Sequence, residues 1–261
     1  MQWAKSEIAT APDGAVFLAD ELEAAQGRQG RTWGIRPGQL LVTIVLKPEI
    51  LSSFSQDDLS IRLNQLNMAL TLGILEPIKA YGAGLKWPND FVINDKKVCG
   101  MLVQLVWHDQ KPVGIVFGFG LNVNTVFEKD DELFSIAGSL ISARHAPSTP
   151  FVPMEPEGRM EGTAVLSTNQ QTIDMRTLYK QLLTSLDHFY TLWKQQQFSH
   201  IYKEWKDHQV YLGKPLTIHQ KDGSIISGIM NQVMPNGDLM LKTGAKIISI
   251  PFYTVEEVKT S

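Results

Sequence analysis

The sequence predicts an α+β fold in which a β-sheet carries helices on one side and a small closed β-barrel follows. Apolar runs of strand length alternate with amphipathic helical stretches in residues 1–208. Turn signals then recur at short, regular intervals, a spacing typical of a small barrel. With 261 residues, the chain is long enough for one domain of ordinary size and a smaller one, which we place at residues 1–208 and 209–261.

The first expected elements are short. Residues 2–10 predict a brief helix that stops at a Pro-Asp-Gly turn. Residues 15–19 form an apolar run of strand length. Residues 40–46 are rich in β-branched side chains, which favours a second strand, and Pro48 ends it.

A long helix is expected over residues 60–76. Apolar residues recur there at three-to-four spacing, which places them on one helical face, at positions 61, 63, 66, 70 and 74. Pro77 marks the end of this helix or a kink close to it.

Strands dominate the stretch that follows. Residues 84–87 predict a strand that ends before Pro88, because the residue before a proline is pushed to extended geometry. Two hairpins are then expected, with their strands at residues 91–93, 96–98, 101–107 and 113–119.

Residues 144–171 differ from their surroundings, since prolines are interspersed there with Ser, Thr, Gly and Glu, and they predict a long surface loop inside the first domain. Residues 173–195 predict a strong helix with Thr172 as its cap, and residues 198–205 a second one. The expected barrel strands lie at residues 216–219, 225–233, 239–241 and 246–250.

The composition restricts the class of protein. The formal net charge is −3, whereas a general nucleic-acid binder carries a basic excess, so we expect no DNA partner. Cys99 is the single cysteine, which excludes an intramolecular disulfide and fits a reducing compartment. The sequence contains neither an apolar run of membrane-spanning length nor the apolar core of a signal peptide. We therefore expect a cytoplasmic protein without a membrane partner.

One loop combines glycines with arginines and ends in an indole. It reads Gln26, Gly27, Arg28, Gln29, Gly30, Arg31, Thr32 and Trp33. Glycine lets a backbone approach a ligand closely, and arginine presents a planar fork of donors that matches carboxylate and phosphate. The loop therefore either wraps an anion or is an ordinary solvated basic loop.

A cation, an amide and a carboxylate follow one another at a strand end, in Lys86, Asn89 and Asp90. Lysine pairs with phosphate as a point charge, and an aspartate at such a place holds magnesium or orients a reacting group. The alternative is an ordinary turn, with Pro88, Asn89 and Asp90 as the turn residues.

Lys97 begins the next strand, and Gly100 would let a ligand lie on the backbone. For Lys97 the alternative is a solvated surface charge. Gly118 opens a Gly-x-Gly pair before Asn122, a weak sign that also fits a β-bulge. Cys99 is expected in the core, because no neighbouring His or basic motif supports a thiolate.

Taken together and in this order, these pieces resemble the biotin protein ligases. The family pattern is Gly-Arg-Gly-Arg-Arg-Gly-Arg-x-Trp, then Lys-Trp-Pro-Asn-Asp, then Lys-x-x-Gly-Ile-Leu-Val-Glu, then Gly-x-Gly-Ile-Asn. The corresponding stretches here are residues 25–33, 86–90, 97–104 and 118–122. The resemblance implies a mixed β-sheet of the class II aminoacyl-tRNA-synthetase and biotin-ligase type, then an SH3-like barrel. It also points to the class without an N-terminal DNA-binding domain.

The resemblance implies an ATP-dependent, AMP-forming ligase. Such an enzyme makes biotinyl-5′-AMP from biotin and ATP with Mg²⁺, then passes biotin to a lysine of the biotin carboxyl carrier domain of a carboxylase. Some members of the family form homodimers, so a homodimer is an open alternative here.

The same resemblance assigns roles to particular residues. The catalytic cations are Arg28, Lys86 and Lys97. Biotin and adenylate contacts fall on Gln26, Gly27, Arg28, Lys97, Gly100 and Gly118. ATP contacts fall on Gly30, Arg31, Trp33, Asn89, Asp90 and Asn122, and Asp90 is also the candidate contact of the Mg²⁺ that ATP brings.

The sequence also departs from the family pattern. Ala25, Gln26 and Gln29 occupy loop positions where the family has glycine and arginine, and Leu22 replaces a glutamine that bonds biotin. The family's Ser-Thr biotin contacts would lie just before Met1. Two alternatives therefore stay open, a ligase for another carboxylic acid such as lipoate, and a non-catalytic relative that binds biotin or the adenylate.

Overall fold

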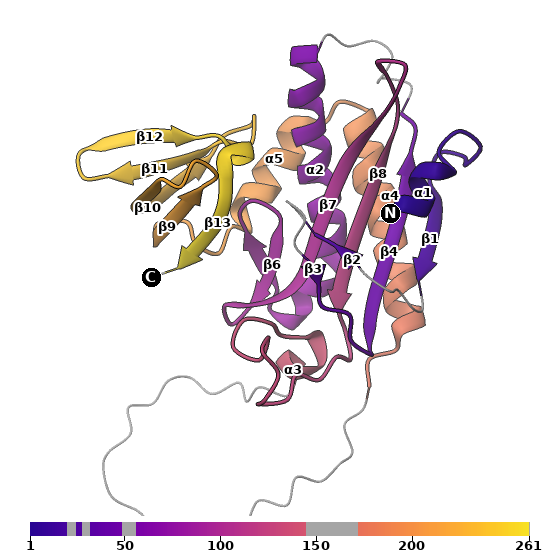
Figure 1. Cartoon of the computed structure of the whole chain (residues 1–261), viewed down its shortest axis with the longest axis horizontal. Helices are drawn as coiled ribbons and strands as arrows, with labels where there is room; N and C mark the ends of the chain where they lie inside the picture. The colour runs from indigo at the N-terminus through magenta and orange to yellow at the C-terminus, as the bar shows by residue number, and fades with distance from the viewer. Residues whose placement is uncertain (20–24, 28–31, 49–55, 145–171, 261) are drawn as a thin grey trace, which may run out of the picture.

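The computed structural model describes residues 1–19, 25–27, 32–48, 56–144 and 172–260 (Figure 1). In these residues, the three longest helices pack on one face of a six-stranded antiparallel sheet, and a five-stranded antiparallel sheet follows. The predicted α+β class is confirmed. Of the expected loop over residues 144–171, only Arg144 lies within the described residues.

The larger sheet has the strand order β1-β4-β8-β7-β6-β5. Each of its strand pairs is antiparallel, so the expectation of a mixed sheet was wrong. The reason is that β5 to β8 follow one another through tight turns, which reverse the chain each time. The strands are β1 (Ala15–Ala19), β4 (Gln39–Leu46), β5 (Gly84–Lys86), β6 (Asp90–Ile93), β7 (Lys96–His108) and β8 (Lys111–Asn122).

Two tight turns set the register of these strands. Asn94 and Asp95 join β6 to β7 with φ of 50° and 62°, and Asp109 and Gln110 join β7 to β8 with φ of 46° and 61°. Two successive left-handed residues are typical of the hairpin turn whose twist matches that of the strands. The two separate strands expected at residues 96–98 and 101–107 form one continuous strand, β7.

The back of the larger sheet is covered by α2 (Gln56–Ile78), α4 (Met175–Lys194) and α5 (Phe198–Asp207) (Figure 1). Alternate residues of β8 face these helices and are at most 5% exposed: Ile115, Phe117, Phe119 and Leu121. Pro77 lies in the last turn of α2, which continues to Ile78. The α4 helix is capped by the side chain of Asp174, which accepts from the Arg176 amide, and not by Thr172 as predicted.

The front of the sheet is covered by short N-terminal elements. These are α1 (Gln2–Ser6) and the paired strands β2 (Ala25–Gln26) and β3 (Thr32–Trp33). The two paired strands cross in front of β7 and β8 (Figure 1). Ala4 and Ile8 pack there against Val45 and Val116. The two faces therefore differ, with a thick helical layer behind and a thin cover in front.

Close packing of α2 on α4 predicts a large stability effect at Gly73. A Cβ at this position would lie 2.8 Å from Leu186 Cδ2 and 2.9 Å from Leu186 Cα, so the helices would have to separate. We expect Gly73→Val to lower the free energy of unfolding by about 2–3 kcal/mol through overpacking. Urea unfolding measures it, with Glu76→Val on the exposed side of α2 as the control for helix propensity. Equal losses in both variants would contradict this view of the interface.

The C-terminal sheet has the strand order β12-β11-β10-β9-β13. Its strands are β9 (Pro215–Gln220), β10 (Ile225–Val233), β11 (Leu239–Thr243), β12 (Lys246–Ile250) and β13 (Val255–Thr260), the last of which was not predicted. Within the described residues, β12 and β13 pair with β11 and β9 but not with each other, so the closed barrel is not confirmed. Pro251 and the turn Phe252–Thr254 divert the chain from β12 across to β9.

Two side chains of the larger unit bind the turn between β10 and β11. The indole Nε1 of Trp87 donates to the Gly237 carbonyl at 3.0 Å, and the Asn64 amide donates to the Asn236 carbonyl at 2.6 Å. Trp87 is only 3% exposed. The C-terminal sheet is therefore docked on the Lys86–Asp90 turn. Among the described helices, none has the length and apolarity that crossing a membrane requires.

Candidate active site

One row of residues crosses the front of the larger sheet. Lys86 of β5 pairs with Asp90 of β6, which pairs with Gly100 of β7, then Gly120 of β8 and Leu41 of β4. Directly paired residues face the same side of a sheet. The row therefore has two charged side chains at one end and two bare glycines beside them. We call this strip of the front face, from Lys86 to Leu41, the trough, and its two glycines the floor.

A β-bulge brings Lys97 to the same face. Phe91 pairs with Cys99, but Val92 pairs with Lys97, so Val98 is an extra residue in β7. In a regular strand, Lys97 and Gly100 are three residues apart and would face opposite sides, because side chains alternate. The bulge at Val98 places both on the same side. As a result, Lys97 Nζ lies 2.7 Å from Asp90 Oδ1, and a Cβ on Gly100 would be 2.9 Å from Lys97 Cε.

Trp33 lies directly on the glycine floor. A Cβ on Gly120 would be 2.9 Å from Trp33 Cε2, and one on Gly100 would be 3.1 Å from Trp33 Cζ3. Lys97 Nζ is 5.4 Å from the Trp33 ring centroid, a cation–π distance. The Trp33 Nε1 donor is buried and has no hydrogen-bond partner among the described residues. A buried donor of this kind is suited to a ligand acceptor.

The trough continues over Gly118, two residues earlier on β8. Thr43 of β4 and Leu102 of β7 flank this glycine in register. The side chain of Met1 lies on it, since a Cβ there would be 2.7 Å from Met1 Sδ. Away from the charged end, the trough is therefore lined mainly by apolar groups and glycine backbone.

Lys86 is the second cation at the charged end. Its Nζ lies 5.9 Å from the ring centroid of Tyr211, and no carboxylate of the described residues lies within ion-pair distance of it. Burial lowers the pKa of Lys86, Asp90 acts in the opposite direction, and the like charge of Lys97 lowers it further. The ammonium is thus partly desolvated and has its donors available.

The lowered pKa predicts that Lys86 costs stability. The unfolded chain holds the proton more tightly than the folded one, so the cost is full below the folded pKa and disappears as the pH rises towards the ordinary value of 10.5. We expect Lys86→Met to be at least as stable as the wild type at pH 7, and its advantage to shrink as the pH rises. Urea unfolding over this pH range measures the difference, and an advantage that grows with pH would contradict the assignment.

Two predicted residues are already engaged with the protein. Asn89 Oδ1 accepts from Asn67 Nδ2 at 3.4 Å. Asn122 is 2% exposed, donates to the Gly138 carbonyl at 2.8 Å and accepts from Gln39 Nε2 at 2.9 Å. Asn122 therefore holds the loop after β8 in place, and a contact with nucleotide stays a prediction for both asparagines.

The glycine–arginine loop is described only in part. Arg28, Gly30 and Arg31 lie outside the described residues, as does the side chain of Gln26. The backbone of Gln26 pairs with Thr32, and Gly27 follows it. The predicted roles of these residues stay predictions.

Neither a metal cluster nor a thiol nucleophile is present in the described part of the chain. No group of three His, Cys, Asp or Glu side chains gathers there, and Asp90 is bound to Lys97. Cys99 is fully buried, and burial raises the pKa of its thiol, so its predicted place in the core is confirmed. The predicted contact of Asp90 with magnesium stays a prediction.

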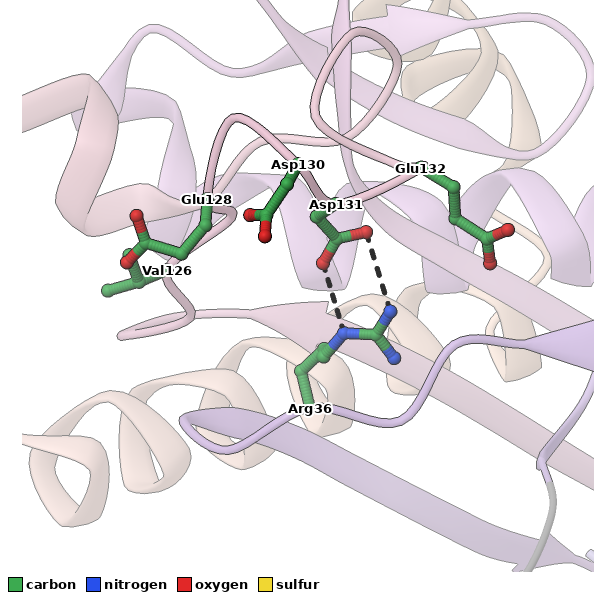
Figure 2. Close-up of a pocket in the computed structure, with 6 residues that line it drawn as sticks. All are labelled: Arg36, Val126, Glu128, Asp130, Asp131 and Glu132. Carbon is green, nitrogen blue, oxygen red and sulfur yellow. Dashed lines mark hydrogen bonds and ion pairs between the residues drawn. The ribbon is translucent and has the colours of Figure 1, made fainter.

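An acidic surface hollow lies elsewhere, between the β3–β4 connection and the loop after β8 (Figure 2). Arg36 reaches Asp131 with Nε at 3.2 Å and Nη2 at 3.4 Å, which neutralises one carboxylate. The other residues that line the hollow are Val126, Glu128, Asp130 and Glu132. This excess of carboxylates repels phosphate, so the hollow does not suit an anionic ligand.

Residues 1–122 match the model of the biotin/lipoate A/B protein ligase family. This stretch, a little under half of the chain, therefore resembles that family. It contains the whole row from Leu41 to Gly120, together with Trp33 and Lys97. The resemblance that the motifs indicated is thus confirmed.

Individual ligases resemble more of the chain. The bifunctional ligase/repressor BirA of Bacillus spizizenii is 32% identical over 139 residues, 51% of this chain and 40% of that protein. This match thus spans less than half of that relative's length. The biotin–[acetyl-CoA-carboxylase] ligase of Mycobacterium tuberculosis is 21% identical over 246 residues, 91% of this chain and 77% of that protein.

The fold is that of a solved biotin protein ligase. The structure from Aquifex aeolicus in complex with biotin and ATP superposes with a TM-score of 0.74 at 20% identity. The superposition covers 100% of this chain and 94% of that one.

Sequence reasoning missed three features of the site. Gly120 and Leu41 join the floor only through strand register, and the Val98 bulge that turns Lys97 has no clear mark in the sequence. The spacing Gly118-x-Gly120 was the available signal, because two glycines at that spacing share one face of a strand.

Proposed function

We propose that this chain is an ATP-dependent biotin protein ligase that forms biotinyl-5′-AMP and transfers biotin to a lysine of a biotin carboxyl carrier domain. The observation that supports it best is the pairing of Lys97 with Asp90 at 2.7 Å beside a glycine floor covered by Trp33. Lys86 adds a second cation at the same end. The trough thus suits an apolar acid whose carboxylate must meet a phosphate.

Two anions react in the first step. A biotin carboxylate oxygen attacks the α-phosphorus of ATP, the bond from that phosphorus to the bridging oxygen breaks, and pyrophosphate leaves. Lys97 would lie between carboxylate and α-phosphate, and Lys86 would face the departing phosphates. Both ammonium groups offset charge that spreads over phosphoryl oxygens in the transition state, and the trough holds the partners in line.

In the second step, the amine of the carrier lysine attacks the acyl carbon. The bond from the acyl carbon to the phosphate oxygen breaks, AMP leaves, and the amine loses a proton to solvent. No enzyme nucleophile is needed, which agrees with the deep burial of Cys99. Lys97 would offset the charge that develops on the leaving phosphate, as it would offset phosphoryl charge in the first step.

The remaining site residues complete this proposal. Gln26, Gly27, Arg28, Gly30 and Arg31 would cover the adenylate and exclude water from the reactive anhydride. Asn89, Asp90 and Asn122 would face the MgATP side, and Gly118 the biotin side. MgATP is the substrate form, because the metal screens the phosphates.

Biotin is favoured over lipoate. The family model spans both acids, but the Mycobacterium tuberculosis relative and the Aquifex aeolicus structure are named as biotin ligases. Leu22, which raised the alternative, lies outside the described residues.

The proposal has three further parts. The partner is the carrier domain of a carboxylase, and the site of action is the cytoplasm. Residues 209–261 form an SH3-like second domain, a proposal supported by the five short strands there. A homodimer stays an open alternative.

The test uses the purified chain with MgATP and single acids, without and then with a biotin acceptor domain. We expect pyrophosphate release with biotin and not with lipoate, and ATP-dependent biotin on the acceptor. Release with lipoate alone would replace the substrate, and biotin binding by calorimetry without turnover would show a non-catalytic relative.

A further inference from the structure

Tyr211 joins the C-terminal segment to the charged end of the trough. It is 4% exposed, its ring lies 5.9 Å from Lys86 Nζ, and its hydroxyl donates to Asp95 Oδ1 at 2.7 Å. Resting on the proposed function, we propose that Tyr211 is a positioning residue, whose ring holds the Lys86 ammonium where the phosphates of MgATP bind.

The backbone fixes the place of this ring. Residues before Tyr211 run beside β5, where Val210 N donates to the Leu85 carbonyl at 3.0 Å and Leu85 N donates to the His208 carbonyl at 2.9 Å. Gly84 makes this approach possible, because a Cβ there would be 2.1 Å from Val210 Cγ1. Lys86 and the ring are thus built on two adjoining segments in fixed register.

The hydroxyl fixes the tilt of the ring. Asp95 lies in the left-handed turn between β6 and β7, so the bond from Tyr211 anchors the ring to the two strands that hold Asp90 and Lys97. Burial and the Asp95 carboxylate raise the pKa of Tyr211, which keeps its hydroxyl a donor at neutral pH.

An aromatic ring beside Lys86 leaves its charge and its donors available, whereas a carboxylate would not. Lys97 is neutralised in part by Asp90, whereas Lys86 has no such ion pair in the described residues. The face of an aromatic ring attracts a cation without cancelling its charge or occupying its donors. The other charges that act on Lys86 are Asp90, Lys97, Asp95 and Glu257, and Lys214 lies 5.4 Å from the centroid of the same ring.

A double-mutant cycle tests this role. The variants are Tyr211→Leu, Lys86→Met and both together, each measured for MgATP affinity by calorimetry and for KM and kcat of biotin-dependent pyrophosphate release. We expect Tyr211→Leu to weaken MgATP binding about tenfold, with little change in the KM for biotin, in line with a partly desolvated cation–π contact. In the Lys86→Met background the same change should have no further effect.

The control is Tyr202→Leu. The Tyr202 hydroxyl donates to the Val233 carbonyl of the C-terminal sheet at 2.7 Å, and its ring faces Lys206 and not Lys86. Additive losses, or equal losses in the control, would overturn the inference.

If Tyr211→Leu does not fold, Tyr211→Phe replaces it, because this change keeps the ring and removes the hydroxyl anchor. We expect it to weaken MgATP binding about threefold in the wild-type background and not at all in the Lys86→Met background. Absence of biotin-dependent turnover would overturn the proposed function alone, because the binding cycle still tests Tyr211.

Discussion

Replacing Lys97 with methionine is expected to lower kcat/KM for biotin-dependent pyrophosphate release by at least about 100-fold. The change keeps the length of the side chain but removes the ammonium that would offset charge at the attacked phosphorus. The loss should appear in both kcat and kcat/KM, since the interaction strengthens in the transition state. Steady-state pyrophosphate assays measure it, and acceptor labelling should fall in parallel.

Lys96→Met is the matched control for this change. Lys96 is the neighbouring residue on β7, but its Nζ donates to the Phe134 carbonyl at 2.7 Å and lies over the Phe134 ring, away from the trough. We expect its activity to stay close to that of the wild type. If Lys97→Met loses less than about threefold, or if both variants lose equally, Lys97 does not have the proposed role.

Replacing Gly120 with valine should be almost as damaging, although it removes no functional group. The new Cβ would lie 2.9 Å from Trp33 Cε2 and 3.2 Å from Leu41 Cδ2, so the indole would have to leave the sheet. A displacement of about 1 Å in a positioning group is enough for a loss of about 100-fold. We expect this loss in kcat/KM for MgATP, together with a thermal unfolding transition that remains cooperative.

Gly114→Val separates a local effect from a general disturbance of β8. Gly114 faces the same side of the strand, but its Cβ would meet Ile8 of the N-terminal cover at 2.9 Å and not Trp33. We expect it to lose stability while the folded protein keeps most of its activity. Equal activity losses in the two variants would show that Trp33 has no special place in the site.

The amino-acid pattern was sufficient where a signal is local. The long helices α2 and α4 and the hairpins of β6, β7 and β8 followed from apolar periodicity and turn residues, because such segments decide their own backbone geometry. The cap of α4 is also a local contact, but Asp174 and not Thr172 makes it, by accepting from the Arg176 amide. The place of β13 depended on tertiary contacts, because it pairs with β9.

For the site, the sequence by itself supplied the residue types on which the proposed chemistry rests. The order of a glycine–arginine loop, Lys86 to Asp90, Lys97 and Gly118 indicated the biotin ligases, since the residue types that bind carboxylate and phosphate are written directly in the chain.

Only the tertiary structure decided how these residues meet. The Val98 bulge turns Lys97 onto the face of Gly100, cross-strand register adds Gly120 to the floor, and Tyr211 reaches Lys86 from the C-terminal segment. Each depends on pairing between segments distant in the chain or on a shift of one residue within a strand. A one-residue shift reverses the face of every side chain beyond it, and sequence spacing alone does not record it.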